Sequence, residues 1–183
     1  MASGARRGDI IDASAPSGEI RAIASLRVAL GWLRIAATAS GICRVSLSPQ
    51  PAAWESVAPG AGGERVADEL VAAATRQLGE YLAGERLAFD LPLDLDAGSA
   101  FQQAVWRATC QVQFGRVVAY GDIARRISNP LACRAVGQAL KRNPLLILVP
   151  CHRVVRMHGG LGGFRAGEEA KLWLLKHEGV ILI

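Results

Sequence analysis

The residues best suited to carry out chemistry lie in the segment Pro150-Cys151-His152-Arg153. A cysteine becomes a strong nucleophile as the thiolate, and a neighbouring imidazole is a common base for that ionisation. Adjacent side chains on an extended chain diverge, so a contact between the two groups would need a bridging water. A buried cysteine is also a frequent packing residue with a raised pKa. The pair alone leaves a reactive and a structural interpretation open.

Two further polar residues could position this pair. Asn143 ends a predicted helix, so its amide is available to brace the turn that follows. Glu178 lies in the last turn of a predicted helix over 168–178, where a carboxylate opposes the helix dipole. That placement predicts a cationic or hydrogen-bonding partner for the carboxylate. His152, Lys176 and an arginine are the candidates.

The spacing of apolar residues and the positions of turn residues in the second half of the chain predict the helices, strands and loops that hold these residues. The pattern predicts a basic pair of short helices across a tight turn, which is typical of a helix-turn-helix and also of an ordinary helical hairpin. The predicted elements are helices over 101–112, 121–127, 131–142 and 168–178, strands at 117–118 and 145–149, and a glycine-rich loop over 159–163.

The first half has the pattern of a small α/β unit. A hairpin, one amphipathic helix and one short strand are expected, and a linker follows them. The predicted elements are strands over 33–38, 42–47 and 87–91, a helix over 64–82 with Val66, Leu70, Ala74, Leu78 and Leu82 on one face, and a linker over 92–98.

Charge separates the two halves. Residues 1–97 hold 9 Lys/Arg and 12 Asp/Glu, a net charge of −3. Residues 98–183 hold 12 Lys/Arg and 4 Asp/Glu, a net charge of +8. A basic segment of this size favours a polyanionic partner, although a merely solvated basic surface has the same composition.

Composition and residue spacing argue against a membrane-spanning protein, a metal-binding protein and a disulfide-stabilised protein. No apolar run is long enough to span a bilayer, and no signal peptide is evident, so a cytoplasmic protein is expected. The four cysteines and three histidines lack metal-ligand spacing, and a disulfide framework is not expected in a reducing compartment.

Several blocks of the sequence, in order and spacing, resemble the methylated-DNA–protein-cysteine methyltransferase family, whose members repair O6-alkylguanine. The resemblance covers residues 98–179 and, more weakly, residues 23–97. The blocks are Phe101-Gln102-x-x-Val105-Trp106, Val118-Ala119-Tyr120-Gly121-Asp122, Arg134-Ala135-Val136-Gly137, Asn143-Pro144, Pro150-Cys151-His152-Arg153-Val154-Val155, Gly160-Leu161-x-Gly163-Phe164 and Lys171-x-x-Leu174-Leu175-x-x-Glu178-Gly179.

The resemblance implies a mixed α/β (α+β) fold. An N-terminal ribonuclease-H-like domain would cover residues 22–92, after a flexible tail over 1–21. A C-terminal winged-helix-like DNA-binding domain with a helix-turn-helix would cover residues 98–183. The implied partner is double-stranded DNA that contains alkylated bases, with no membrane, cofactor or metal. A monomer is expected, and cooperative binding along DNA is left open.

The resemblance also implies a role for each site residue. Cys151 would be the nucleophile and alkyl acceptor, with its proton passing through water to His152 and with Glu178 orienting the imidazole. Tyr120 would donate a proton toward guanine N3, and Asn143 would brace the Cys-bearing turn. DNA and base contacts are implied for Arg134, which would fill the gap left by a flipped base, and for Ala135, Gly137, Val154, Gly162, Gly163, Phe164 and Arg165.

The expected product is a thioether, which nothing in the sequence would cleave, so each molecule should act once. O6-alkylguanine and O4-alkylthymine are the expected substrates. Phe164, Arg165 and Ala119 depart from the family's usual residues, which affects the expected substrate range and rate. The alternatives are a non-catalytic sensor of alkylated DNA, a helix-turn-helix transcription factor and a cysteine hydrolase.

Overall fold

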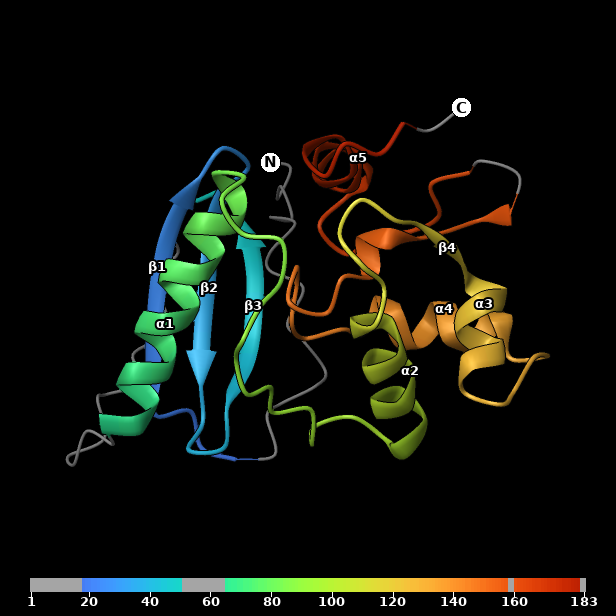
Figure 1. The fold of residues 1–183 in the computed structure, drawn as a ribbon. Coiled ribbons are helices and arrows are strands. Elements are labelled where there is room, and N and C mark those ends of the chain that lie inside the picture. The colour runs from blue at the N-terminus through green and yellow to red at the C-terminus, as the bar shows by residue number, and fades with distance from the viewer. Residues whose placement is uncertain (1–17, 51–64, 158–159, 182–183) are drawn as a thin grey trace, which may run out of the picture.

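A computed structural model describes residues 18–50, 65–157 and 160–181. It places a sheet with one covering helix beside a mainly helical half (Figure 1). Most of the predicted tail over 1–21 lies outside the described residues, as do Glu64 and Gly159.

The sheet of the first half has three antiparallel strands in the order β1-β2-β3. They are β1 (Ala22–Val28), β2 (Gly31–Ala37) and β3 (Ile42–Ser48). The predicted hairpin is confirmed as β2 and β3, in which Ile35 pairs with Val45. The sequence did not predict β1, whose small residues have weak strand propensity.

Helix α1 (Arg65–Leu82) covers one face of this sheet (Figure 1). The helix is confirmed, but its buried stripe is offset from the predicted one, because Val66 is 55% exposed. The residues that pack inward at three- and four-residue spacing are Ala67, Val71, Ala74, Leu78 and Tyr81.

The strand predicted over 87–91 is wrong. The backbone of this segment forms hydrogen bonds with the side chain of Gln77, and not with a neighbouring strand. The amide of Gln77 donates to the Asp90 carbonyl at 3.0 Å and accepts from the Asp90 backbone N–H at 2.9 Å. Within the alternating apolar residues, Phe89 packs on α1, where its ring lies 5.3 Å from that of Tyr81, whereas Leu87 is exposed.

Helix α2 (Ala100–Cys110) opens the second half with a capping box. The Ser99 hydroxyl accepts from the Gln102 N–H, and the Gln102 side chain accepts from the Ser99 N–H. Trp106 is fully buried on this helix and donates its indole N–H to the Ala139 carbonyl at 2.9 Å. This hydrogen bond ties α2 to the helix that bears the predicted DNA contacts.

The remaining elements complete the second half of the molecule (Figure 1). Two short parallel strands, β4 and β5, pair where Val118 meets Val154. The predicted helix over 131–142 begins two residues later than expected, because Asn129 and Ala132 close a turn. The elements are β4 (Val118–Ala119), α3 (Tyr120–Arg126), α4 (Cys133–Lys141), the 3-10 helix η1 (Cys151–Arg153), β5 (Val154–Val155) and α5 (Glu168–His177).

The segment over 145–149 is buried, as predicted, but it is not a strand. Leu145 makes one bridge to Val45 of β3, and the chain then turns back so that the Val149 N–H donates to the Leu145 carbonyl at 2.9 Å. Ile147 holds a φ of 71°, an unusual conformation for a β-branched residue. The apolar run is therefore a buried turn between the two halves.

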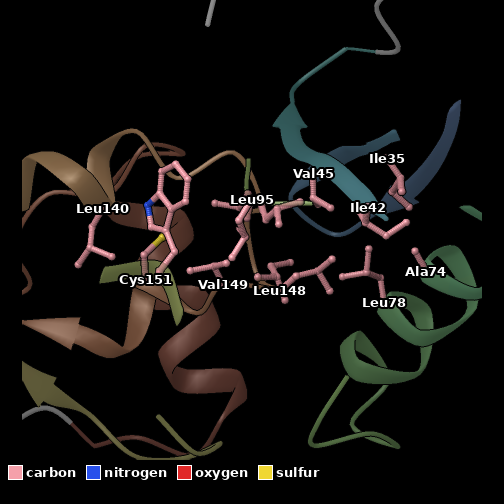
Figure 2. Close-up of a cluster of buried hydrophobic side chains, with 14 of the residues drawn as sticks. Ile35, Ile42, Val45, Ala74, Leu78, Leu95, Leu140, Leu148, Val149 and Cys151 are labelled. Atoms are coloured by element: carbon pink, nitrogen blue, oxygen red, sulfur yellow. The ribbon is translucent and has the colours of Figure 1, made fainter. Parts of the chain in front are cut away.

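One hydrophobic core joins the two halves of the molecule. Figure 2 shows Ile35 and Leu78 at one end, Val45 and Leu148 in the middle, and Leu140 and Cys151 at the other end. The Cys-bearing segment is therefore fixed by packing from both halves. Among the described residues, no helix is long and apolar enough to cross a bilayer.

Candidate active site

Cys151 begins η1 directly after the buried turn, and the residue is only 6% exposed. The Cys151 N–H donates to the Val149 carbonyl at 2.7 Å, which closes the backbone tightly before the thiol. In Figure 2 the side chain lies between Leu140 and Val149. The nucleophile candidate thus sits on a rigid backbone with little access to solvent.

Asn143 braces this turn, as the sequence predicts. Its side-chain amide donates to the Val149 carbonyl at 3.0 Å and to Cys151 Sγ at 3.2 Å. Its carbonyl oxygen accepts from the Leu145 N–H at 2.9 Å. One buried side chain therefore holds both ends of the turn and also contacts the sulfur.

Opposing effects act on the pKa of the Cys151 thiol. Burial raises the pKa, because it disfavours the thiolate. The hydrogen bond from Asn143 and the charges of Lys171 and Arg165 lower it. Burial is the strongest effect and leaves the pKa above its usual value, so ionisation needs a nearby base.

His152 and Glu178 form a buried pair. His152 Nε2 lies 2.8 Å from Glu178 Oε1, and both side chains are fully buried. Burial lowers the pKa of His152 despite the carboxylate, so the ring is neutral near pH 7. If Nε2 donates to the carboxylate, Nδ1 is the free acceptor, and it has no protein partner among the described residues.

Glu178 has more partners than the sequence suggested. Arg153 donates to both carboxylate oxygens at 2.9–3.0 Å, and Tyr81 of α1 donates its hydroxyl to Oε1 at 2.6 Å. The Gly115 N–H donates to Oε2 at 3.1 Å. Burial raises the pKa of this carboxyl, but the hydrogen bonds from His152 and Arg153 outweigh burial and hold the pKa at about 2. Glu178 is therefore ionised.

The sequence did not single out Arg153, Tyr81 or Gly115 as partners of Glu178. Arg153 belongs to the Pro-Cys-His-Arg block, and an arginine was one of the candidates for the partner of Glu178. The structure shows that both His152 and Arg153 contact that carboxylate, and Lys176 is exposed. Tyr81 carried no local signal, since it lies 97 residues from Glu178.

Lys171 was also missed as a site residue. It is fully buried on α5, and its ammonium donates to the Val154 carbonyl at 2.6 Å. Burial lowers its pKa to about 8. The available signal was a lysine on the apolar face of a helix, three and four residues before Leu174 and Leu175.

Tyr120, the first residue of α3, faces the loop that follows Cys151. Gly162 approaches the Tyr120 hydroxyl so closely that a Cβ at Gly162 would lie 2.6 Å from it. Gly162 also has a φ of +71°, so glycine is required there for two reasons. Burial and the nearby Cys151 raise the pKa of the Tyr120 hydroxyl, which stays protonated. Phe164 of the same loop packs edge-on at 6.3 Å from the His152 ring.

The predicted DNA and base contacts do not share one exposed face, because Val154 is buried in β5. Arg134 and Ala135 are exposed on α4, whereas Gly137 packs at ordinary distance against the Tyr120 ring. Gly163 is exposed and Arg165 is half-buried in the loop before α5. Among the described residues, no group of three or more His, Cys, Asp or Glu side chains could hold a metal ion.

Comparison with known proteins gives matches across both halves. Residues 24–95 match the family described as 6-O-methylguanine DNA methyltransferase, ribonuclease-like domain. Residues 100–180 match the family described as 6-O-methylguanine DNA methyltransferase, DNA binding domain. These matches confirm the predicted fold class.

Individual relatives agree with this. A methylated-DNA–protein-cysteine methyltransferase of Methanosarcina acetivorans is 46% identical over 112 residues, 61% of this chain and 71% of the relative. The constitutive one of Bacillus subtilis is 42% identical over 151 residues, 81% of this chain and 90% of the relative. The crystal structure of Mycobacterium tuberculosis OGT in complex with DNA is similar with a TM-score of 0.71 and 34% identity, covering 84% of this chain and 90% of that one.

Fold and site define a protein with a ribonuclease-like domain and a DNA-binding domain, the second of which holds a buried cysteine beside a His–Glu pair. The basic half of the chain is the DNA-binding half. The chain belongs to the methylated-DNA–protein-cysteine methyltransferase family.

Proposed function

We propose that this protein repairs DNA by moving the alkyl group of O6-alkylguanine onto Cys151, once per molecule. The observation that carries the proposal is the placement of the thiol: Asn143 fixes its sulfur at 3.2 Å, and the neutral His152 is oriented by Glu178 at 2.8 Å. A thiolate is a suitable nucleophile for a saturated carbon. O4-alkylthymine is the second proposed substrate, since it presents the same alkyl–oxygen bond.

The proposed reaction begins with loss of the thiol proton. A water would pass this proton from Cys151 Sγ to Nδ1 of His152, and Glu178 would stabilise the imidazolium that forms. Lys171 and Arg165 favour the thiolate electrostatically. These charges stabilise the thiolate in a buried site, where otherwise it would be disfavoured.

The second step is a displacement at the alkyl carbon. A sulfur–carbon bond forms, the carbon–O6 bond breaks, and the electron pair stays on the guanine. The Tyr120 hydroxyl would donate a proton toward guanine N3, which neutralises the leaving base. The proton taken up by His152 would return through water to Tyr120, and exchange with solvent would move the guanine proton from N3 to N1. The product is a thioether on Cys151 and an unmodified guanine. The chain would not regenerate its thiol, so one protein repairs one lesion.

The base must leave the duplex to reach a cysteine that is 6% exposed. We propose that the exposed Arg134 fills the space that the extruded base leaves in the duplex. Ala135 and the neighbouring small residues of α4 would let the helix approach the minor groove. Val154, Gly162, Gly163, Phe164 and Arg165 would contact the flipped base. We further propose that a tail over 1–21 precedes domains over 22–92 and 98–183, and that the protein acts on DNA as a monomer in the cytoplasm.

The test compares cysteine variants on a duplex with one O6-methylguanine that carries a labelled methyl group. Cys151→Ala should transfer no label but should still bind the duplex. Cys133→Ala, which alters an exposed cysteine of α4, is the control and should transfer the label normally. Label on the Cys151→Ala protein would overturn the assignment of the nucleophile, and absence of label on the unaltered protein would favour a sensor.

A further inference from the structure

Leu131 is the most exposed large apolar side chain among those that the structure describes, at 95%. It lies in the turn between α3 and α4, which the Ala132 N–H closes onto the Asn129 carbonyl at 3.0 Å. Pro130 precedes it and restricts the backbone of this turn. The side chain is therefore presented outward from a short, constrained turn.

A single exposed leucine is ordinary on a protein surface, so its surroundings decide its meaning. Helices α3 and α4 carry one acidic residue, Asp122, which pairs with Arg125. Leu131 itself lies three residues before Arg134. The exposed basic residues of this helix pair are Arg125, Arg126, Arg134, Lys141 and Arg142.

This charge distribution limits the kind of partner that can cover Leu131. A basic face favours a polyanion such as DNA, and a protein that offered only an apolar pocket would leave the surrounding cations unmatched. An isobutyl group gains nothing from a phosphate, which stays hydrated. On DNA it can be buried only against deoxyribose and base edges.

We propose that Leu131 is an apolar anchor for DNA, buried against the deoxyribose and base edges of the minor groove beside the extruded nucleotide. This inference shares one assumption with the proposed function, namely that DNA binds to the exposed face of α3 and α4. Ala132 and Ala135 are small, so the backbone around Leu131 can approach the groove closely. The anchor supplies binding that does not depend on counterion release.

Salt dependence separates this role from a phosphate contact. The affinity for an unmodified duplex is measured at several salt concentrations for Leu131→Ala and for Arg142→Ala. Leu131→Ala should bind roughly tenfold more weakly with an unchanged slope of log affinity against log salt. Arg142→Ala should reduce that slope by about one.

Leu87→Ala is the matched control, because Leu87 is 60% exposed and belongs to the first half of the chain, outside α3 and α4. It should bind DNA like the unaltered protein. Unchanged affinity of Leu131→Ala, or a loss matched by Leu87→Ala, would overturn the proposal. A change of salt slope in Leu131→Ala would also overturn it.

Reaction with the free base O6-benzylguanine separates this proposal from the proposed function. Leu131→Ala should react with the free base at the unaltered rate and with O6-methylguanine in a duplex more slowly, when the DNA is not saturating. Equal loss on both substrates would mean that Leu131 acts through the fold, which contradicts the proposal. If the unaltered protein reacts with neither substrate, the proposed function fails, and the affinity measurements still decide the role of Leu131.

Discussion

Ion pairing and hydrogen bonding at Glu178 explain how a buried site keeps a neutral base next to a thiol. The carboxylate accepts from His152, Arg153, Tyr81 and Gly115. Arg153 balances its charge, so His152 need not be protonated to pair with it. The imidazole is thereby oriented and remains able to accept a proton, which is what the proposed thiol activation requires.

Lys171 provides a prediction about the thiol. Lys171→Met removes an ammonium that lowers the Cys151 pKa, and the chain keeps a long apolar side chain at that site. Alkylation of Cys151 by iodoacetamide at pH 7 should be roughly tenfold slower, the change expected for one unit of thiol pKa. The rate would be followed against pH, with modification mapped by mass spectrometry.

The control for this prediction is Lys176→Met, on the same helix but exposed. It should react like the unaltered protein at every pH. An unchanged pH profile for Lys171→Met would show that the ammonium does not act on the thiol, and would limit Lys171 to holding the Val154 carbonyl.

The His152–Glu178 pair predicts a loss of stability in acid. The pKa of His152 is lowered from 6.5 and that of Glu178 from 4.5 to about 2, so the unfolded chain binds more protons than the folded one below each ordinary value. The free energy of unfolding should therefore fall below pH 6.5, and again as pH falls from 4.5 toward 2. The Glu178 contribution is on the order of 3 kcal/mol.

Denaturant unfolding at pH 7.5, 5.5 and 3.5 measures this dependence. A free energy of unfolding that stays constant over this range would show that neither group is perturbed by folding. In that case His152 and Glu178 would not have the protonation states that the proposed mechanism needs.

At the scale of elements, α1 and α5 join the site to the ribonuclease-like half. Tyr81 of α1 is fully buried and its ring packs against Phe89, Phe114 and His177. Its hydroxyl reaches Glu178, and its backbone carbonyl lies 2.7 Å from His177 Nε2. The first half of the chain therefore contributes directly to the position of the Glu178 carboxylate.

Tyr81→Phe tests this link with little change in packing. The ring contacts remain, and the loss of one hydrogen bond to a charged acceptor should lower the free energy of unfolding by about 1.5–3 kcal/mol. Transfer from a lesion duplex should also slow, because Glu178 orients His152 less firmly. A variant with unchanged stability and unchanged transfer rate would show that the hydroxyl contributes to neither.

Elements with strong periodicity could be predicted from the sequence, and those defined by distant partners could not. Helices α1, α2 and α5 follow from their apolar spacing, and the β2–β3 hairpin follows from its turn. The apolar run over 145–149 resembled a strand, but the Asn143 side chain folds it into a turn. Likewise, Gln77 takes the backbone hydrogen bonds that a strand at Asp90 would have given to a neighbour.

On the scale of the whole molecule, the acidic first half and the basic second half share one core but differ in surface charge. The sequence predicted Cys151, His152, Glu178 and Asn143, which the structure brings together, because their blocks are short and specific. Tyr81 and Lys171 were not predicted, since their importance depends on which distant atoms they contact. The sign of the charge indicated a polyanion, but not which surface it meets.

The central claim, a single irreversible alkyl transfer to Cys151, is tested most directly by intact-protein mass spectrometry. The unaltered protein is incubated with an excess of duplex that contains one O6-methylguanine, and its peptides are then mapped. The account predicts one added methyl group per molecule, located on Cys151, with no further gain on longer incubation. An unchanged mass, or a methyl group on any other residue, would contradict it.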